Sequence, residues 1–176
     1  DKLVSKGHRV AIAEQMENPK HTKGLVKRDV TRLITPGTVV NSSLLSDNAN
    51  NFFVALDQVG SVFGLTFLDV TTAEFRTIEL ESKRELLNEL YRLRPYEFLS
   101  SEKFKKNNEE LFADLRISYS FLHNTREDWH FDHQSAYDFL VNHMQVHSLD
   151  GFGLKGMVAG INASGALLSY IHEELR

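Results

Sequence analysis

Cysteine is absent from this 176-residue chain, and proline (3 residues) and tryptophan (1 residue) are scarce. Without cysteine the chain forms no disulfide bridge and has no thiolate for catalysis, which fits a reducing compartment. No apolar run approaches the roughly 18 residues that a membrane-spanning helix needs, and no signal-like apolar segment follows the first residues. These absences predict a cytoplasmic protein without a membrane partner.

A strong excess of charge of one sign is also missing, since the formal net charge is −4. This balance excludes a uniformly basic nucleic-acid-binding module. One segment departs from it, because between residues 20 and 32 a single acid, Asp29, accompanies five basic residues, Lys20, Lys23, Lys27, Arg28 and Arg32. Any polyanion would bind here, although a solvated charged face explains the pattern equally well.

The first 51 residues predict an extended segment followed by a linker. A helix end capped by Gly7, a short buried strand at 10–13 and a second strand within 25–34 come first. The sequence TPGT at 35–38 then breaks the pattern, because proline holds the residue before it in an extended conformation. Residues 37–51 are rich in Ser, Asn and Asp, which is typical of a linker.

From residue 52 the pattern predicts an α/β domain. Three apolar runs at 52–56, 62–70 and 75–80 favour an antiparallel meander. Helices and strands then alternate: a helix begun by the Ser82–Glu85 capping box, a strand at 96–100, a helix at 107–115, a strand at 116–122 and a helix at 133–144. The predicted fold is a mixed sheet with helices on both faces, in the order β-β-β-α-β-α-β-α, which is the order of the ribonuclease H-like fold.

A last helix is predicted at 157–176. Its larger residues recur at alternating four- and three-residue steps, the spacing of a heptad-like seam. Because no nearby segment offers a matching seam, we expect its partner helices to belong to a helical domain outside this chain.

The ribonuclease H-like order raises an enzymatic alternative, since enzymes of that fold bind two divalent metals through acidic residues. The candidate acids are Asp57, Asp69, Glu85, Glu89 and Glu97. Residues of these types more often form turns, cap helices or face solvent, and a fold does not by itself supply a site. We therefore predict no catalytic residues.

Two further motifs have the spacing of a ligand-binding site but lack the surrounding sequence that such a site requires. Residues 151–156 spell G-x-G-x-x-G, but no clear strand precedes them and too little chain follows for a dinucleotide fold, so a glycine-rich joint is the better interpretation. The pairs His130/His133 and His143/His147 have spacings that zinc can use, yet they are separated along a helix and are predicted to be solvated. The sequence thus predicts no metal and no cofactor within this chain.

A long block near the start carries a resemblance. GHRVAIAEQMENPKHTKGLVKRDVTRLITPGT closely resembles the signature G-Y-x-V-A-I-C-E-Q-x-E-D-P…K-G-x-V-x-R-x-V-x-R…T-P-G-T of the bacterial DNA mismatch-repair MutS family. The later segments LDVTTAEFR, ELYRLRPYEFL, DGFGL and ASGALLSYI resemble that family in the same order. Departures are small, such as Ala13 where the family has cysteine.

The resemblance implies a division of the chain. Residues 1–36 would be the tail of the mismatch-binding domain, 37–51 a linker, 52–150 the connector domain with a ribonuclease H-like fold, and 151–176 the start of the helical lever or core domain. The family's Phe-x-Glu mismatch wedge would lie upstream, and its ATPase site, which uses ATP and Mg²⁺, would lie downstream.

The resemblance also implies a function and partners. The chain would be a non-catalytic connector that transmits conformational change in a homodimeric mismatch-recognition ATPase, which binds mismatched duplex DNA and docks MutL. Arg28, Lys27 and Lys23 would approach the DNA backbone, and Tyr137 and Asp138 would belong to a docking surface for MutL. A two-metal nuclease and a stand-alone DNA-binding module are the alternatives.

Overall fold

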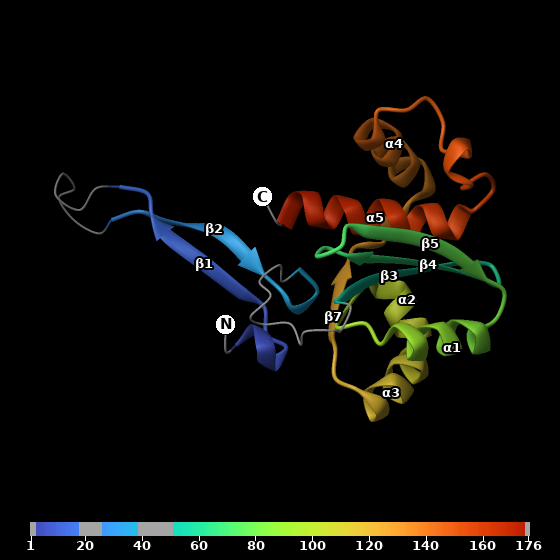
Figure 1. The fold of residues 1–176 in the computed structure, drawn as a ribbon, viewed down its shortest axis with the longest axis horizontal. Coiled ribbons are helices and arrows are strands. Elements are labelled where there is room, and N and C mark those ends of the chain that lie inside the picture. The colour runs from blue at the N-terminus through green and yellow to red at the C-terminus, as the bar shows by residue number, and fades with distance from the viewer. Residues whose placement is uncertain (1–2, 18–25, 39–50, 175–176) are drawn as a thin grey trace.

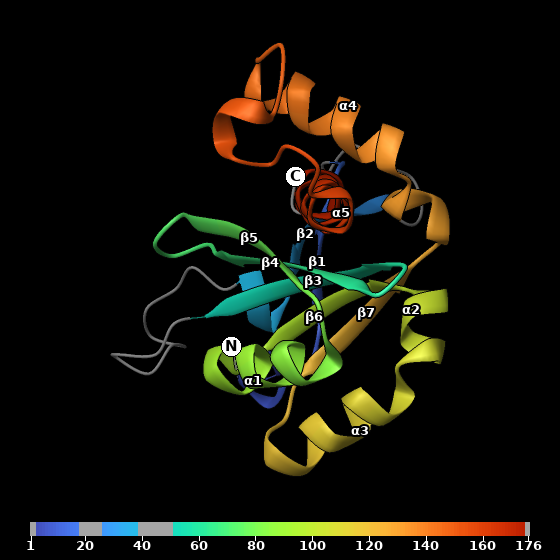
Figure 2. The same cartoon turned by 90° about the vertical axis from the view of Figure 1, so that its right-hand side faces the viewer.

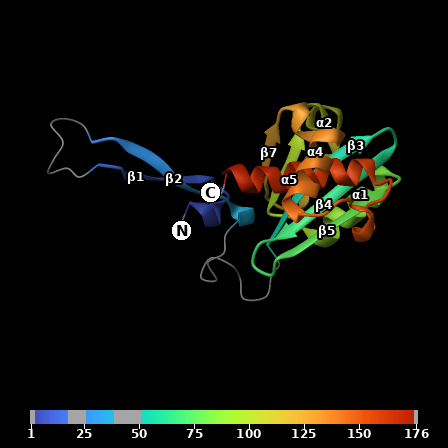
Figure 3. The same ribbon diagram turned by 90° about the horizontal axis from the view of Figure 1, so that it is seen from above.

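The computed structural model describes residues 3–17, 26–38 and 51–174 of the chain. A two-stranded hairpin near the N-terminus projects away from a body that is built on a five-stranded sheet (Figure 1). Seen from above, the hairpin extends from one end of this body (Figure 3). Within the described part of the chain, every helix is too short or too polar to cross a membrane.

The hairpin follows a short 3-10 helix, η1 (Val4–Lys6), which ends at Gly7 in a left-handed conformation with φ 83°. Strands β1 (Val10–Gln15) and β2 (Arg28–Ile34) pair antiparallel, with a register shift after Ile12. Both strands and the glycine cap confirm the sequence predictions, but the expected burial of the first strand is wrong, because residues 11–15 of β1 are exposed on the projecting hairpin. A 3-10 turn, η2 (Pro36–Thr38), ends the hairpin where the proline was expected to break it.

The sheet of the body has the strand order β5-β4-β3-β6-β7. The meander pairs antiparallel and consists of β3 (Phe52–Val59), β4 (Val62–Asp69) and β5 (Glu74–Leu80). On the other side of β3, two strands pair in parallel, β6 (Glu97–Ser101) and β7 (Leu122–Arg126). The predicted mixed sheet is confirmed, because β3 joins an antiparallel half to a parallel half.

Helices cover both faces of this sheet, as predicted (Figure 2). One face packs on α1 (Lys83–Leu93), α2 (Glu102–Asn107) and α3 (Glu109–Ser118). The other face packs on α5 (Val158–Glu174), and α4 (His133–Met144) lies outside α5 as a further layer. Two 3-10 turns precede these last helices, η4 (Asp128–Phe131) and η5 (Asp150–Phe152).

The predicted strand at 116–122 is wrong. Helix α3 continues to Ser118, and the strand begins only at Leu122. Within the last turn of the helix, the side chain of Ile117 is 85% exposed. The apolar alternation of the segment suggested a strand, whereas β7 has the polar sequence LHNTR. Its His123 and Asn124 side chains are accommodated by hydrogen bonds to Ser100 and Glu97 of β6, and a hydrophobic pattern cannot reveal such bonds.

The expectation that the partners of the last helix lie outside the chain is also wrong. Helix α5 packs on the sheet through small residues, including Ala163 and Ala166, which lie against Phe53 of β3. It approaches so closely that a Cβ atom added at Gly64 of β4 would lie 2.1 Å from the carbonyl oxygen of Ala159. Its other side, which carries the seam residues Ile161 and Leu168, packs on α4, so the seam has a partner within the chain that periodicity alone did not identify.

The half-buried ring of His123 is expected to make stability depend on pH. Its Nε2 lies 2.8 Å from the Ser100 hydroxyl, and its ring centre lies 4.1 Å from that of Phe112. Burial is the main cause that lowers the pKa of His123 to about 3, and the charges of Lys105 and Arg116 act in the same direction. Between this value and the ordinary pKa of about 6.5, the unfolded chain binds the additional proton, so stability falls as the pH drops below about 6.5.

We predict that His123→Gln removes this dependence. From pH 7.5 to pH 5, the histidine lowers the free energy of unfolding by about 2 kcal/mol, and the variant should lack that part of the change. Urea denaturation at the two pH values measures it, with the exposed His147 changed to Gln as the control. An equal pH dependence in His123→Gln and the parent chain would contradict the assignment.

Candidate functional site

Two of the three basic residues predicted to meet DNA lie at the end of the hairpin that is remote from the body (Figure 1). Lys27 and Arg28 are both exposed, and Lys23 lies outside the described residues. The Met16 amide donates to the Lys27 carbonyl at 2.9 Å, which continues the pairing of the two strands by one residue. The basic pair is therefore presented on a projecting, hydrogen-bonded ribbon.

The charge at this end of the hairpin is mixed. The Lys27 amide donates to the carboxylate of Glu17 at 3.4 Å, and Glu14 of β1 stands opposite Asp29 of β2. Acidic side chains of the facing strand thus offset part of the basic charge. An approach to phosphate at this end would depend on individual side chains such as Arg28 rather than on a broad positive field.

The predicted docking residues Tyr137 and Asp138 lie on α4, far from the basic end of the hairpin (Figure 1). Asp138 is exposed and accepts a hydrogen bond of 3.0 Å from the Gln134 side chain one turn earlier. Tyr137 is half-buried and packs on the cluster between α4 and α5. Asp138 is therefore the more accessible of the two, and Tyr137 also supports the helix.

The acids considered for a two-metal site do not converge. Asp57 pairs with Gly64 near the turn between β3 and β4, whereas Asp69 pairs with Phe52 at the other end of the same two strands. Five steps along β3 separate these positions, about 17 Å at about 3.4 Å per residue. Two catalytic metals sit about 4 Å apart, so these carboxylates cannot share them.

Each of the two aspartates has a structural partner instead. Asp57 is buried and accepts a hydrogen bond of 2.8 Å from the Asn162 side chain of α5. Burial raises the pKa of its carboxyl, and the bond from Asn162 acts in the opposite direction. Asp69 accepts hydrogen bonds from the Thr71 amide at 2.9 Å and the Asn51 amide at 3.4 Å, as expected of a turn-forming residue.

A hollow of about 400 Å³ does open beside Asp57, at the carboxyl ends of β3 and β6. Its other charged side chains are Lys103 and Asp128. Two carboxylates next to a lysine do not make the set of acids that two-metal chemistry requires. Among the residues that the structure describes, no group of three or more His, Cys, Asp or Glu side chains could hold a metal ion.

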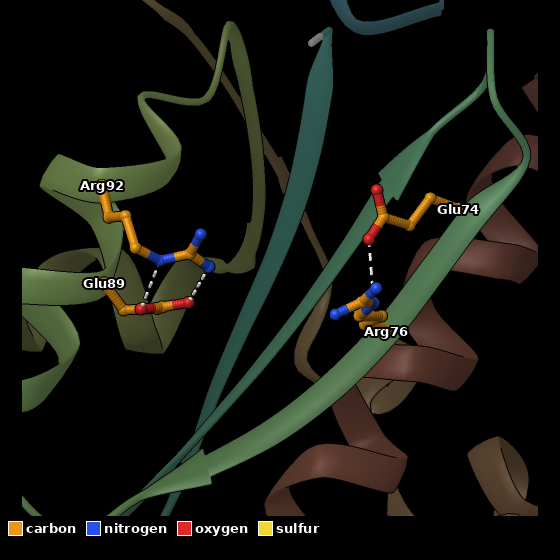
Figure 4. Close-up of polar contacts among 4 residues, drawn as sticks. All are labelled: Glu74, Arg76, Glu89 and Arg92. Carbon is orange, nitrogen blue, oxygen red and sulfur yellow. Dashed lines mark hydrogen bonds and ion pairs between the residues drawn. The ribbon is translucent and has the colours of Figure 1, made fainter.

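Glu85 and Glu89 of α1 are likewise engaged locally. The Ser82 hydroxyl accepts from the Glu85 amide at 3.2 Å, which confirms the predicted cap. Figure 4 shows Glu89 paired with Arg92, whose Nε donates to the carboxylate at 3.0 Å. This hydrogen bond is the main cause that lowers the pKa of Glu89. Such surface ion pairs contribute little stability, but the cap and the ion pair together account for Glu85 and Glu89 without a metal.

A second ion pair lies on β5 in the same view (Figure 4). Arg76 Nε lies 2.8 Å from the Glu74 carboxylate, two residues earlier on the same strand. The side chains of residues two apart point to one face of a strand, so the pair forms without bringing distant segments together. It is a local feature of the sheet edge rather than part of a site.

The histidine and glycine motifs also have local explanations. The His133 ring lies 3.0 Å from the Asn162 side chain, and the His143 ring stacks on Phe139, so the two pairs do not assemble. The glycine motif forms the turn between α4 and α5, where Gly153 and Gly156 have φ of 76° and 78°. These are conformations that glycine adopts without strain, which agrees with a joint.

The last of the five acids, Glu97, occupies the boundary between the hairpin and the body. It is fully buried at the start of β6, and its carboxylate accepts a hydrogen bond of 2.8 Å from the Gly37 amide of η2. Asn124 of β7 donates to its other oxygen. The one available signal was an acid next to an apolar run in YEFLS, and nothing in the sequence pointed to Asn124.

Comparison with known families fits this two-part architecture. Residues 51–176 match the family model of MutS domain II, and residues 1–43 match that of MutS domain I. The chain belongs to the MutS family. Its hairpin falls within the match to domain I, and the whole five-stranded body, α5 included, falls within the match to domain II.

Several relatives carry the name DNA mismatch repair protein MutS. One from Protochlamydia amoebophila is 65% identical over 99% of this chain, and one from Chlamydia muridarum is 47% identical over 99%. A more distant one, from Lachnoclostridium phytofermentans, is 38% identical over 97% of the chain. The chain spans about a fifth of the length of these relatives, namely 20%, 21% and 18%.

The separation of the acids predicts that the chain does not cleave DNA. Labelled duplex incubated with the chain and Mn²⁺ should remain intact, because Asp57 and Asp69 cannot hold metals jointly. The matched variants Asp57→Asn and Asp69→Asn control for a contaminating nuclease. Cleavage by the parent chain that either variant abolishes would establish a metal-dependent nuclease and overturn this assignment.

Proposed function

We propose that this chain is the connector region of a DNA mismatch-recognition ATPase, and that it passes conformational change between the mismatch-binding end and the ATPase end. The observation that carries the proposal is the meeting of the two family matches at a buried junction between the hairpin and the body. A segment of the first domain and the body of the second are packed together there, as a connecting element requires.

The architecture supports this role in two ways. The strand order β5-β4-β3-β6-β7, with a meander followed by parallel strands, agrees with a ribonuclease H-like fold. The separation of its acidic residues agrees with a fold of this kind that serves as a scaffold. The division into 1–36, 37–51, 52–150 and 151–176 remains our proposal for the longer protein, although α5 packs with the body.

The partners we propose belong to that longer protein. It would act as a homodimer on mismatched duplex DNA, with ATP and Mg²⁺ bound outside this chain, and it would dock MutL on the connector. The exposed side of α4 is our candidate for the MutL surface, because α4 is the outer layer of the body and leaves Asp138 accessible.

Charge reversal tests this surface. In the full-length protein, Asp138→Lys should lower crosslinking to MutL about fivefold, the equivalent of about 1 kcal/mol of binding energy. The matched control is Asp114→Lys, since Asp114 is exposed on α3 at the opposite face of the sheet. Equal crosslinking by both variants and the parent would remove α4 as the docking surface.

The exposed position of Arg28 favours a second, weaker activity, contact with the DNA backbone. If Arg28 contacts one phosphate, Arg28→Ala should reduce the slope of log affinity against log salt concentration by about 0.9. Duplex titrations at several salt concentrations measure the slope. Arg84→Ala, which removes an exposed arginine from α1, is the control of equal charge, and an equal effect of the two variants would mean that Arg28 has no specific role.

A further inference from the structure

Both ends of the hairpin are tied to adjacent strands of the body through one pair of buried side chains. Arg9, directly before β1, donates from Nη1 to the Asn124 side-chain oxygen at 3.5 Å. Asn124 of β7 donates its own amide to Glu97 of β6. The second oxygen of Glu97 accepts from the Gly37 amide, just after β2, at 2.8 Å. A continuous chain of hydrogen bonds thus starts before one hairpin strand and ends after the other.

Glu97 has no exposed surface, and its carboxylate is occupied by this junction. Burial raises the pKa of the Glu97 carboxyl. Hydrogen bonds from Thr35, Gly37 and Asn124 and the charge of Arg9 act in the opposite direction. An acid that is buried in a sheet without such partners would be strongly destabilising, so the hairpin residues are part of what makes Glu97 acceptable there.

The turn at residues 35–38 packs tightly against Glu97 and Phe53. A Cβ atom at Gly37 would lie 2.9 Å from the Cβ and Oε2 atoms of Glu97 and 3.0 Å from the Cβ of Phe53. The turn is closed on itself by a contact of 2.7 Å between the hydroxyls of Thr35 and Thr38. It leaves no space for a side chain at Gly37, which is the physical reason for glycine in TPGT.

A further bond secures the turn from the side of β3. Asn51, directly before that strand, donates its side-chain amide to the Pro36 carbonyl at 2.7 Å. Pro36 and Gly37 are therefore both bound to the body, one through its carbonyl and the other through its amide. The turn is therefore held to the body by two hydrogen bonds.

We propose that Glu97 is a positioning residue that fixes the direction of the N-terminal hairpin relative to the sheet through this two-point tie. One point of attachment would leave the ribbon free to swing, whereas ties at Arg9 and Gly37 hold both of its strands. The tie stands independently of the proposed function. Its consequence, that Glu97 sets where Arg28 is presented without touching DNA, rests on the proposed contact between Arg28 and DNA.

A purely structural role for Glu97 would have different effects. If the carboxylate only completed the sheet, its loss would lower the stability of the body and leave the direction of the hairpin unchanged. If it positions the hairpin, disturbing the junction from the hairpin side should release the ribbon while the sheet stays intact. Gly37→Ala makes that disturbance, because Gly37 lies outside the sheet and its new methyl group would press on Glu97.

The absence of cysteine allows a direct measurement of hairpin direction. Spin labels on Val30→Cys in β2 and Ile117→Cys in α3, both exposed, report the distance between the hairpin and the body by pulsed electron resonance on the 176-residue chain. We expect a single narrow distribution in the otherwise unchanged chain. Glu97→Ala and Gly37→Ala should broaden it at least twofold, and Glu97→Gln, which keeps one acceptor, should lie between.

Ser100→Ala is the matched control, since Ser100 is buried on the same strand but bonds to His123 rather than to the hairpin. It should lower stability and leave the distribution narrow. Narrow, unshifted distributions in both Glu97→Ala and Gly37→Ala would overturn the proposal, and Gly37→Ala decides the matter alone if Glu97→Ala does not fold. Arg28→Ala changes no residue of the tie, so unchanged DNA binding by this variant, together with a narrow distribution, would count against the proposed function only.

Discussion

Strand β3 is the element on which the rest of the structure depends, because it is buried on both faces and paired along both edges. Its residues Phe52, Val54 and Leu56 lie in the core shared with α1, α2 and α3, while Phe53 and Ala55 lie against α5. Burial of each large apolar side chain contributes roughly 1.5–3 kcal/mol. The antiparallel meander, the parallel strands and both helical layers are all arranged around this one strand.

Several buried polar residues join one part of the chain to another. Asn162 ties α5 to Asp57 of β3, and the hydroxyl of Ser164 reaches Thr66 of β4 at 2.9 Å. Glu97 and Asn124 tie the hairpin to the parallel half of the sheet. Since a buried polar group without a partner is costly, each of these contacts favours one arrangement of the joined parts over others. The role in transmitting conformational change that we propose needs such definite joints.

The three regions to which we assign roles differ in how they are built. The exposed end of the hairpin presents Arg28 on a two-stranded ribbon, and the outer side of α4 presents Asp138 on a helix packed through another helix. The joint at Glu97 is buried between them. Partners can reach the hairpin end and the outer side of α4 directly. The buried joint at Glu97 has no such access, and in our proposal it acts by setting where the hairpin end is held.

The sequence by itself determined those helices and strands that have clear capping residues or a regular apolar spacing. The Asp132 cap and the apolar spacing predicted α4 within its observed bounds, and the family resemblance followed from a single continuous block. Tertiary structure alone decided three other features: the polar strand β7, the packing of α5 on the sheet, and the burial of Glu97. Each of these depends on a partner distant in the chain, such as Ser100 for His123, the Gly64 backbone for α5, and Gly37 for Glu97. Periodicity and capping signals depend only on neighbours within a few residues along the chain. They therefore cannot reveal contacts between residues that are distant in the sequence.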